Sequence, residues 1–102
     1  MRRGEVWWAN LDKRRPVVLV SRDEAYAVRA LVIVAPVTTT IRGYAVELKL
    51  GKREGLPRTS VINCDWLVTV AKADLTERAG MLSRSKLAQL DDALRFALGL
   101  QA

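Results

Sequence analysis

The hydrophobic and polar positions of this chain follow a strand pattern over residues 5–82 and a helical pattern after them. Runs rich in β-branched and aromatic residues, bounded by turn residues, predict strands at 5–11, 16–21, 31–37 and 44–50. Shorter runs predict further strands at 60–63, 66–70 and 80–82. The runs at 16–21 and 31–37 are apolar without interruption, which is typical of strands buried on both faces, whereas 44–50 alternates and should have one wet face.

The last part of the chain predicts an amphipathic helix, with Ser83 as its N-cap and Gly99 as its stop. Asp91 and Arg95 are spaced as an i, i+4 ion pair on one face of this helix. Another face is apolar and carries Leu87, Leu90, Leu94, Ala97 and Leu98. With no internal repeat or linker, residues 1–102 predict one mainly β domain, in which five to seven short antiparallel strands form a small barrel followed by this helix.

The composition indicates the cellular environment in which the protein works. Half of the 102 residues are hydrophobic, as in globular proteins, and the longest apolar runs have the length of a strand. They fall well short of the roughly 20 residues that a membrane-crossing helix needs, and no apolar signal segment follows Met1. We therefore expect a cytoplasmic protein without a membrane partner.

Histidine is absent and Cys64 is the lone cysteine, which limits the chemistry available to the chain. The commonest zinc ligand and the commonest general base at neutral pH are missing, and no intramolecular disulfide can form. Any catalysis should therefore need no metal and no cofactor, and should depend on Asp, Glu, Arg, Lys, Ser, Thr or Tyr. Cys64 is most simply explained as a small buried residue.

Positive charge is concentrated in the first part of the chain. The formal charge is +6, with 12 Lys and Arg against 6 acids in residues 1–60 and 5 against 5 in residues 61–102. Of the 17 cations, 12 are arginine, whose planar fork suits phosphate. This distribution favours a polyanionic partner, nucleic acid first and acidic protein second, although such charge also serves solubility.

Cationic and hydroxyl side chains lie at the ends of two predicted strands. Arg14 and Arg15 open the run at 16–21, and a triplet of threonines, Thr38 to Thr40, closes the run at 31–37. Guanidinium and hydroxyl groups both donate hydrogen bonds to oxyanions. The pattern therefore predicts an oxyanion pocket at these strand ends.

Five segments in this order resemble the MazF/PemK family of toxin endoribonucleases over nearly the whole chain: RRGEVWWANL, RRPVVLVSRD, VAPVTTT, SVINCDWLVTV and the leucine-spaced helix. The resemblance implies an SH3-like β-barrel, also found in CcdB, that forms a homodimer and cleaves single-stranded RNA without metal. It implies attack of a 2′-hydroxyl on the adjacent phosphate, which gives a cyclic phosphate and a free 5′-hydroxyl. The implied protein partner is an acidic antitoxin, so that the chain would be the growth-arresting toxin of the pair.

The resemblance assigns catalytic roles to Arg15, Thr38 and Asp65. Arg15 matches the family's catalytic arginine and should clamp the phosphate oxygens, because a guanidinium with a pKa above about 12 hardly deprotonates. Thr38 matches the active-site threonine, whose hydroxyl can donate to a non-bridging oxygen. Asp65 matches an aspartate that some members use for acid–base chemistry, and the alternative is a turn or capping aspartate.

Two departures from the family pattern leave the general base open. Asn63 stands where those members have a second arginine, so Asp65 has less support from neighbouring charge. The connection at residues 12–14 replaces a longer loop whose glutamate has been implicated in catalysis, and Asp12 is the nearby acid that could substitute for it. Because such loops contact the bases, the target motifs of relatives should not transfer to this chain.

Other residues are expected to bind RNA. Adjacent strand residues face opposite ways, so at most one of Trp7 and Trp8 should point into the core. Trp66 could stack on an unpaired base, although core or interface packing is the alternative for all three tryptophans. The residues expected at the RNA are Arg3, Arg14, Arg42, Lys52, Arg53, Asn63 and Trp66.

Two other functions stay open on the sequence alone. A non-enzymatic toxin of the CcdB type would bind a protein target such as DNA gyrase, and the missing loop glutamate is its main support. Arg15 and Thr38 argue against that alternative. A plain RNA-binding domain without turnover is the third.

Overall fold

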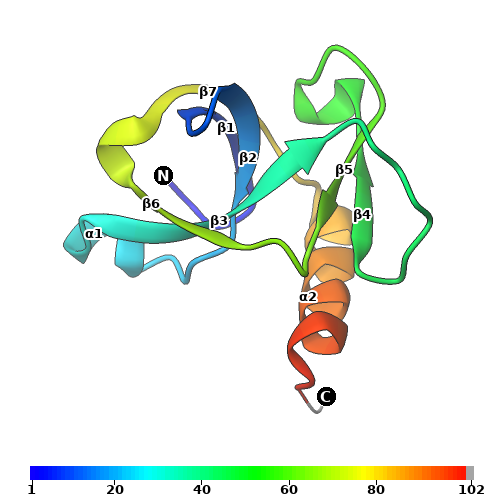
Figure 1. Ribbon diagram of the computed structural model, residues 1–102. Helices are drawn as coiled ribbons and strands as arrows, with labels where there is room; N and C mark the ends of the chain where they lie inside the picture. Colours follow the sequence, from blue (N-terminus) through cyan, green and yellow to red (C-terminus); the bar gives the residue numbers. More distant parts are fainter. Residues whose placement is uncertain (101–102) are drawn as a thin grey trace.

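The computed structural model describes residues 1–100 of the chain (Figure 1). Its strands are β1 (Glu5–Asn10), β2 (Arg14–Leu19), β3 (Leu31–Thr38), β4 (Glu47–Leu50), β5 (Ser60–Asn63), β6 (Val68–Ala71) and β7 (Leu75–Met81). Its helices are α1 (Ala25–Val28) and α2 (Arg84–Leu98), with two 3₁₀ turns, η1 (Lys52–Glu54) and η2 (Lys72–Asp74). The prediction of a mainly β chain with a C-terminal helix is confirmed.

The strands form one curled antiparallel sheet around β3. The order is β4-β5-β3-β2-β1-β7, and β6 also pairs with β3. In Figure 1, β3 crosses the middle of the molecule and links β1, β2, β6 and β7 on one side to β4, β5 and α2 on the other. The end of β3 therefore lies where the two halves of the sheet meet.

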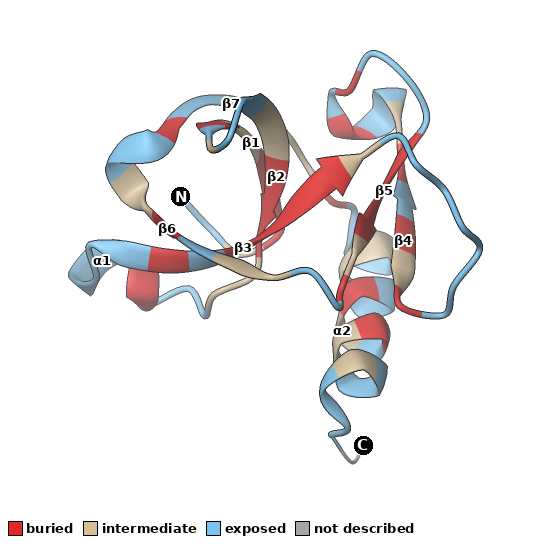
Figure 2. Cartoon of the chain, in the orientation of Figure 1, coloured by how far each residue is buried: buried red, intermediate tan, exposed pale blue. Residues whose placement is uncertain are grey.

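Two hydrophobic cores lie on opposite faces of β2, which explains its unbroken apolar run. Val18 faces a core shared with α2, whereas Val17 and Leu19 face a second core that includes α1. All three side chains are fully buried. The buried stretches of β2 and β3 are red in Figure 2. The prediction that the run at 16–21 is covered on both faces is therefore confirmed for its central residues.

The run at 31–37 is buried on both faces only in its second half, because before Val34 only Val32 is buried. Leu31 and Ile33 are 58% and 43% exposed, because α2 packs against β4 and leaves this end of the sheet face uncovered. From Val34 onward the strand is enclosed. The prediction of a strand buried throughout is thus wrong at its start.

The predicted strand at 44–50 begins three residues later than expected, at Glu47. The Glu47 carboxylate accepts hydrogen bonds from the backbone N–H groups of Arg42, Gly43 and Tyr44, with the shortest, from Gly43, at 2.8 Å. The Glu47 N–H in turn donates to the Tyr44 carbonyl at 3.0 Å. These contacts close a turn just before β4, and of the three residues before Glu47 only Val46 bonds across to the segment after β5, accepting the Cys64 N–H at 2.8 Å.

Helix α2 confirms the predicted caps and corrects the predicted ion pair. The Ser83 hydroxyl accepts the Lys86 N–H, and Gly99 ends the helix in the left-handed region at φ 69°. Asp91 and Arg95 do not pair: Arg95 binds Asp92 at 3.0 Å, and Asp91 binds Arg3 at 2.6 Å. The tertiary partner of Asp91 therefore replaces the expected pair within the helix. No helix in residues 1–100 has the length and hydrophobicity to span a membrane.

Candidate active site

Arg15 and Thr38 lie at the same end of two neighbouring antiparallel strands. In the β2–β3 pair, Leu19 lies opposite Val34, and the pairing ends where Val17 lies opposite Pro36. Arg15 precedes Val17 by two residues, and Thr38 follows Pro36 by two residues and pairs with Val61 of β5. The guanidinium and hydroxyl predicted to grip one anion thus come from the end of the sheet at which β3 passes from β2 to β5.

The Arg15 side chain is held from two directions. One of its terminal nitrogens, Nη2, lies 3.2 Å from Asp12 Oδ2, and its guanidinium carbon lies 5.1 Å from the centre of the Trp66 ring. The side chain is 15% exposed, and its Nε is buried without a hydrogen-bond partner among the described residues. One donor of Arg15 is therefore left without a partner among the described residues.

Thr38 ends β3 with a hydroxyl that is oriented by the following turn. Its Oγ1 accepts the backbone N–H of Thr40 at 3.1 Å. Since this bond uses the oxygen as an acceptor, the hydroxyl hydrogen can be donated elsewhere. Thr38 also borders two cavities, one on each side of the strand end.

The first of these, here called the polar cavity, has a volume of about 230 Å³ and is lined by Thr38, Thr40, Arg42, Glu47, Asn63 and Trp66. The turn closed by Glu47 positions Arg42 on its wall. Because Trp66 also stacks with Arg15, the polar cavity is next to the guanidinium. The structure therefore brings together four predicted site residues around this cavity, Thr38, Arg42, Asn63 and Trp66, and Trp66 in turn contacts Arg15.

The second, here called the apolar cavity, has a volume of about 160 Å³ and is lined by Trp8, Pro16, Val37, Thr38, Thr39, Leu56, Pro57, Arg58 and Ser60. Sequence reasoning did not select Trp8 or Arg58 for this region. Trp7 packs against the second core, so the expected opposite orientation of Trp7 and Trp8 is confirmed. That alternation was the signal that one of the two tryptophans would be available outside that core.

The two acidic residues near Arg15 have different surroundings. Asp12 contacts the guanidinium directly; although desolvation acts to raise its pKa, hydrogen bonds from the Lys13 and Asp12 amides and the charge of Arg15 lower it overall. Asp65 is exposed and lines neither cavity, and its N–H donates to Asn63 Oδ1 at 2.8 Å in a turn. The contact with Arg15 is therefore made by Asp12.

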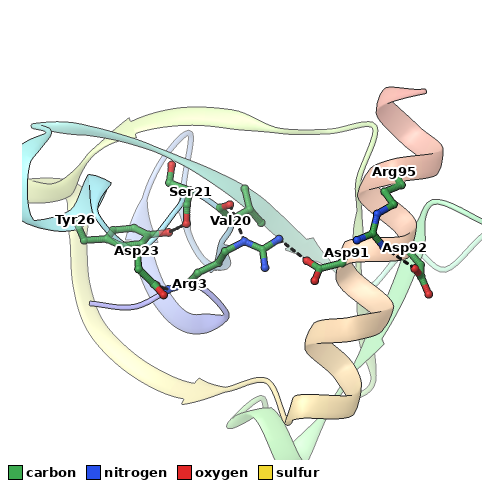
Figure 3. A network of polar contacts seen from close by, with 8 residues as sticks. All are labelled: Arg3, Val20, Ser21, Asp23, Tyr26, Asp91, Asp92 and Arg95. Carbon is green, nitrogen blue, oxygen red and sulfur yellow. Dashed lines mark hydrogen bonds and ion pairs between the residues drawn. The ribbon is translucent and has the colours of Figure 1, made fainter. Parts of the chain in front are cut away.

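Arg3 lies with helix α2 rather than with Arg15. Its Nη2 binds Asp91 at 2.6 Å, and its Nε donates to the Val20 carbonyl at 3.2 Å. Figure 3 shows these contacts joining the N-terminal segment to α2. The donors of Arg3 therefore hold the N-terminal segment against α2, and Arg3 lines neither of the two cavities.

The other predicted cations surround the site without entering the cavities. The Arg14 guanidinium lies over the Trp8 ring, 4.5 Å from its centre, and also pairs with Glu77 at 3.4 Å. Lys52 and Arg53 are exposed on η1, in the connection that carries Leu56 to Arg58. Cys64 is buried as predicted. Within residues 1–100, no three His, Cys, Asp or Glu side chains are grouped to hold a metal ion.

Comparison with known proteins identifies the family of the chain. Residues 2–98 match the family model described as "PemK-like, MazF-like toxin of type II toxin-antitoxin system". The chain is 41% identical over 99 residues to the probable endoribonuclease MazF5 of Mycobacterium tuberculosis, an alignment that covers 94% of this chain and 91% of that protein.

Solved structures agree over the same length. The Mycobacterium tuberculosis toxin MazF-mt6 is 36% identical, with a TM-score of 0.92 and coverage of 96% of this chain and 99% of that one. An endoribonuclease in complex with its cognate antitoxin, from a mycobacterial species, is 27% identical, with a TM-score of 0.91 and coverage of 100% and 98%. The chain therefore belongs to the family of PemK-like, MazF-like toxins of type II toxin–antitoxin systems.

Proposed function

We propose that this chain is an endoribonuclease toxin that cleaves single-stranded RNA by attack of a 2′-hydroxyl on the adjacent phosphate, without a metal. The observation that carries the proposal is the placement of Arg15 and Thr38 at the same end of the neighbouring strands β2 and β3, where Thr38 lines two cavities. An RNA phosphate bound there would have two cavities nearby for its neighbouring nucleotides.

Arg15 and Thr38 have different roles in this reaction. As the 2′-oxygen attacks, charge accumulates on the non-bridging phosphate oxygens, and the fixed guanidinium of Arg15 stabilises it. The neutral Thr38 hydroxyl donates to one of these oxygens and mainly orients the phosphate. Stacking on Trp66 restricts the guanidinium before the substrate arrives, which lowers the cost of ordering it.

As the 2′-oxygen attacks phosphorus, its proton is transferred to a carboxylate, the bond from phosphorus to the 5′-oxygen breaks, and that oxygen takes a proton from water to leave as the 5′-hydroxyl. Asp65 is the acid that the family resemblance assigns, and it directly precedes Trp66. Asp12 is the acid in contact with Arg15. Replacing each by asparagine separates them, because the loss of the base lowers kcat by about 100-fold or more.

We further propose that the chain works in the cytoplasm as a homodimer and that an acidic antitoxin neutralises it. Exposed apolar residues offer surface for such contacts, namely Val28, Leu31, Ile33, Phe96, Leu98 and Leu100. The net charge of +6 favours an acidic partner. The names of the relatives favour turnover over the gyrase-binding alternative.

The test is cleavage of a single-stranded RNA pool by the purified chain in excess EDTA, with mapping of both new ends. We expect 5′-hydroxyl and 2′,3′-cyclic phosphate ends, and we expect a 2′-deoxy substitution at the mapped nucleotide to block cleavage there. Intact RNA together with capture of a protein target would contradict the proposal. Cleavage that persists at the 2′-deoxy position would contradict the mechanism.

A further inference from the structure

We propose that the apolar cavity binds one unpaired nucleobase, that of a nucleotide next to the phosphate gripped by Arg15 and Thr38, and that it thereby selects the cleavage site. This inference rests on the proposed function. It adds a ligand class and two specificity residues, Trp8 and Arg58.

The cavity is placed correctly for a flanking base. Trp8 lies opposite Pro16 in the β1–β2 pair, and both line the cavity together with Val37 of β3. Thr38, which the proposed function places at the phosphate, lines the same cavity. A base held against Trp8 would therefore lie beside a phosphate bound at Thr38.

Trp8 is held in a conformation suited to stacking. The Arg14 guanidinium lies over its ring, and the pairing of Arg14 with Glu77 of β7 holds this cation in place. The backbone of Trp8 is fixed between β2 and β7, opposite Pro16 and Glu77. A ring that is ordered before binding loses little conformational entropy when a base stacks on it.

The opposite wall is also ordered before any ligand binds. Leu56, Pro57 and Arg58 follow Gly55, whose backbone crosses β7 so closely that a Cβ there would lie 2.0 Å from the Ala79 carbonyl oxygen. Gly55 has a φ of 86°, which also favours glycine. The cavity is therefore a preformed slot between a strand and an anchored loop.

The lining chemistry matches a nucleobase. Trp8, Leu56 and Pro57 present apolar surface for the faces of a flat ring, and unpaired bases stack on aromatic side chains whatever their sequence. Arg58 borders the cavity, whose lining is mostly apolar, and its guanidinium can only donate hydrogen bonds. Such a donor favours a base with carbonyl acceptors, uracil or guanine, over adenine.

The first experiment measures binding of an oligonucleotide that cannot be cleaved, because the nucleotide at the cleavage site carries a 2′-deoxy substitution. A series of such oligonucleotides lacks the base at one position each, and this abasic position differs from one oligonucleotide to the next. With the parent chain, we expect one position flanking the 2′-deoxy nucleotide at which loss of the base weakens binding about 10-fold. With Trp8→Ala, the intact oligonucleotide should bind as weakly as the abasic one, and removing the base should cost nothing more. Trp8→Phe keeps an aromatic face and should retain most of the effect. Since Trp8→Ala could disturb β1, unfolding curves of both variants accompany the test.

The second experiment maps cleavage ends for Arg58→Gln and for its matched control, Arg53→Gln, on one RNA pool. Arg58→Gln should reduce the preference for one base at the flanking position about 10-fold, whereas Arg53→Gln should weaken cleavage equally at all sequences.

Additive effects of base removal and Trp8→Ala, or an unchanged preference in Arg58→Gln, would overturn the inference. Loss of antitoxin binding with an unchanged RNA profile would likewise overturn it and assign the cavity to a protein side chain. Because binding is measured without cleavage, the failure of this inference would leave the proposed function standing. Likewise, the cavity could bind a base even if the chain did not cleave RNA.

Discussion

The regions around Arg15 and Arg3 differ, although each contains a largely covered arginine beside a carboxylate. Arg3 is joined to the Val20 carbonyl and to Asp91 at 2.6 Å, so its donors serve the fold. Arg15 has a longer contact of 3.2 Å with an Asp12 side chain that is 69% exposed, and its Nε has no partner in the described residues. An arginine with an incompletely used guanidinium is suited to a ligand, whereas one whose donors are paired within the fold is suited to stability.

The largest effect should come from Arg15→Ala. Removing the fixed positive charge at the phosphate should lower the rate of RNA cleavage at least about 100-fold, measured in single-turnover assays. The free energy of unfolding should change little, because the Asp12 contact is exposed. Arg15→Lys keeps the charge but not the planar fork and should be intermediate. Full activity in Arg15→Ala would remove the distinction between the two arginines.

The next effect should come from Thr38→Val, which removes the hydroxyl but keeps the shape of the side chain. Loss of one neutral hydrogen bond of about 1.4 kcal/mol corresponds to a rate about 10-fold lower. The Thr40 N–H also loses its acceptor, so the turn should be checked by comparing melting curves. An unchanged rate would show that Arg15 binds the phosphate without Thr38.

Arg3→Ala should give the opposite result to Arg15→Ala. Loss of the contacts with Asp91 and Val20 should reduce the free energy of unfolding by about 1 kcal/mol, measured by urea titration. Cleavage under native conditions should match the parent. Asp91→Asn is the matched control and should destabilise the chain through the same contact. Weaker RNA binding by Arg3→Ala would show that Arg3 contacts RNA, as the sequence predicts.

The smallest effect should come from Asp12→Asn, which removes the carboxylate that competes with RNA for Arg15. We expect KM to fall about 2- to 5-fold with kcat unchanged. The pKa of Asp12 is lowered from 3.8, so the carboxylate competes above that pH and is neutralised only as the pH falls below it. The advantage of the variant should therefore be present at neutral pH and should disappear in strong acid. A large fall in kcat would instead identify Asp12 as the general base.

The elements that depend on local sequence were predictable, whereas those that depend on distant partners were not. The strand predicted at 16–21 is observed two residues earlier, as β2 (Arg14–Leu19), and the predicted caps of α2, Ser83 and Gly99, are observed. The local sequence predicts that Asp91 pairs with Arg95 in its own helix. It does not indicate that Arg3, which is far away in the sequence, lies next to Asp91 in the fold. The late start of β4 likewise depends on which amides the Glu47 side chain can reach.

The candidate site shows the same limit. Arg15 and Thr38 were predicted because both stand at the ends of apolar runs, and the register brings those ends together. Trp8 and Arg58 were missed because their nearness depends on how β1 and the segment after η1 pack around Thr38. The exposed turn at Asp65 corresponds to the alternative that the sequence left open, and its part in catalysis stays a prediction.

The burial of Cys64 has a consequence for oxidative stress. Burial, with a smaller contribution from the charge of Asp65, raises the pKa of this thiol to about 11, so it stays protonated at neutral pH. Peroxide reacts with the thiolate, and the side chain is 1% exposed, so Cys64 should resist conversion to sulfenic acid. A chain without disulfides, histidine or a reactive thiol should therefore keep working while a cell's redox balance fails.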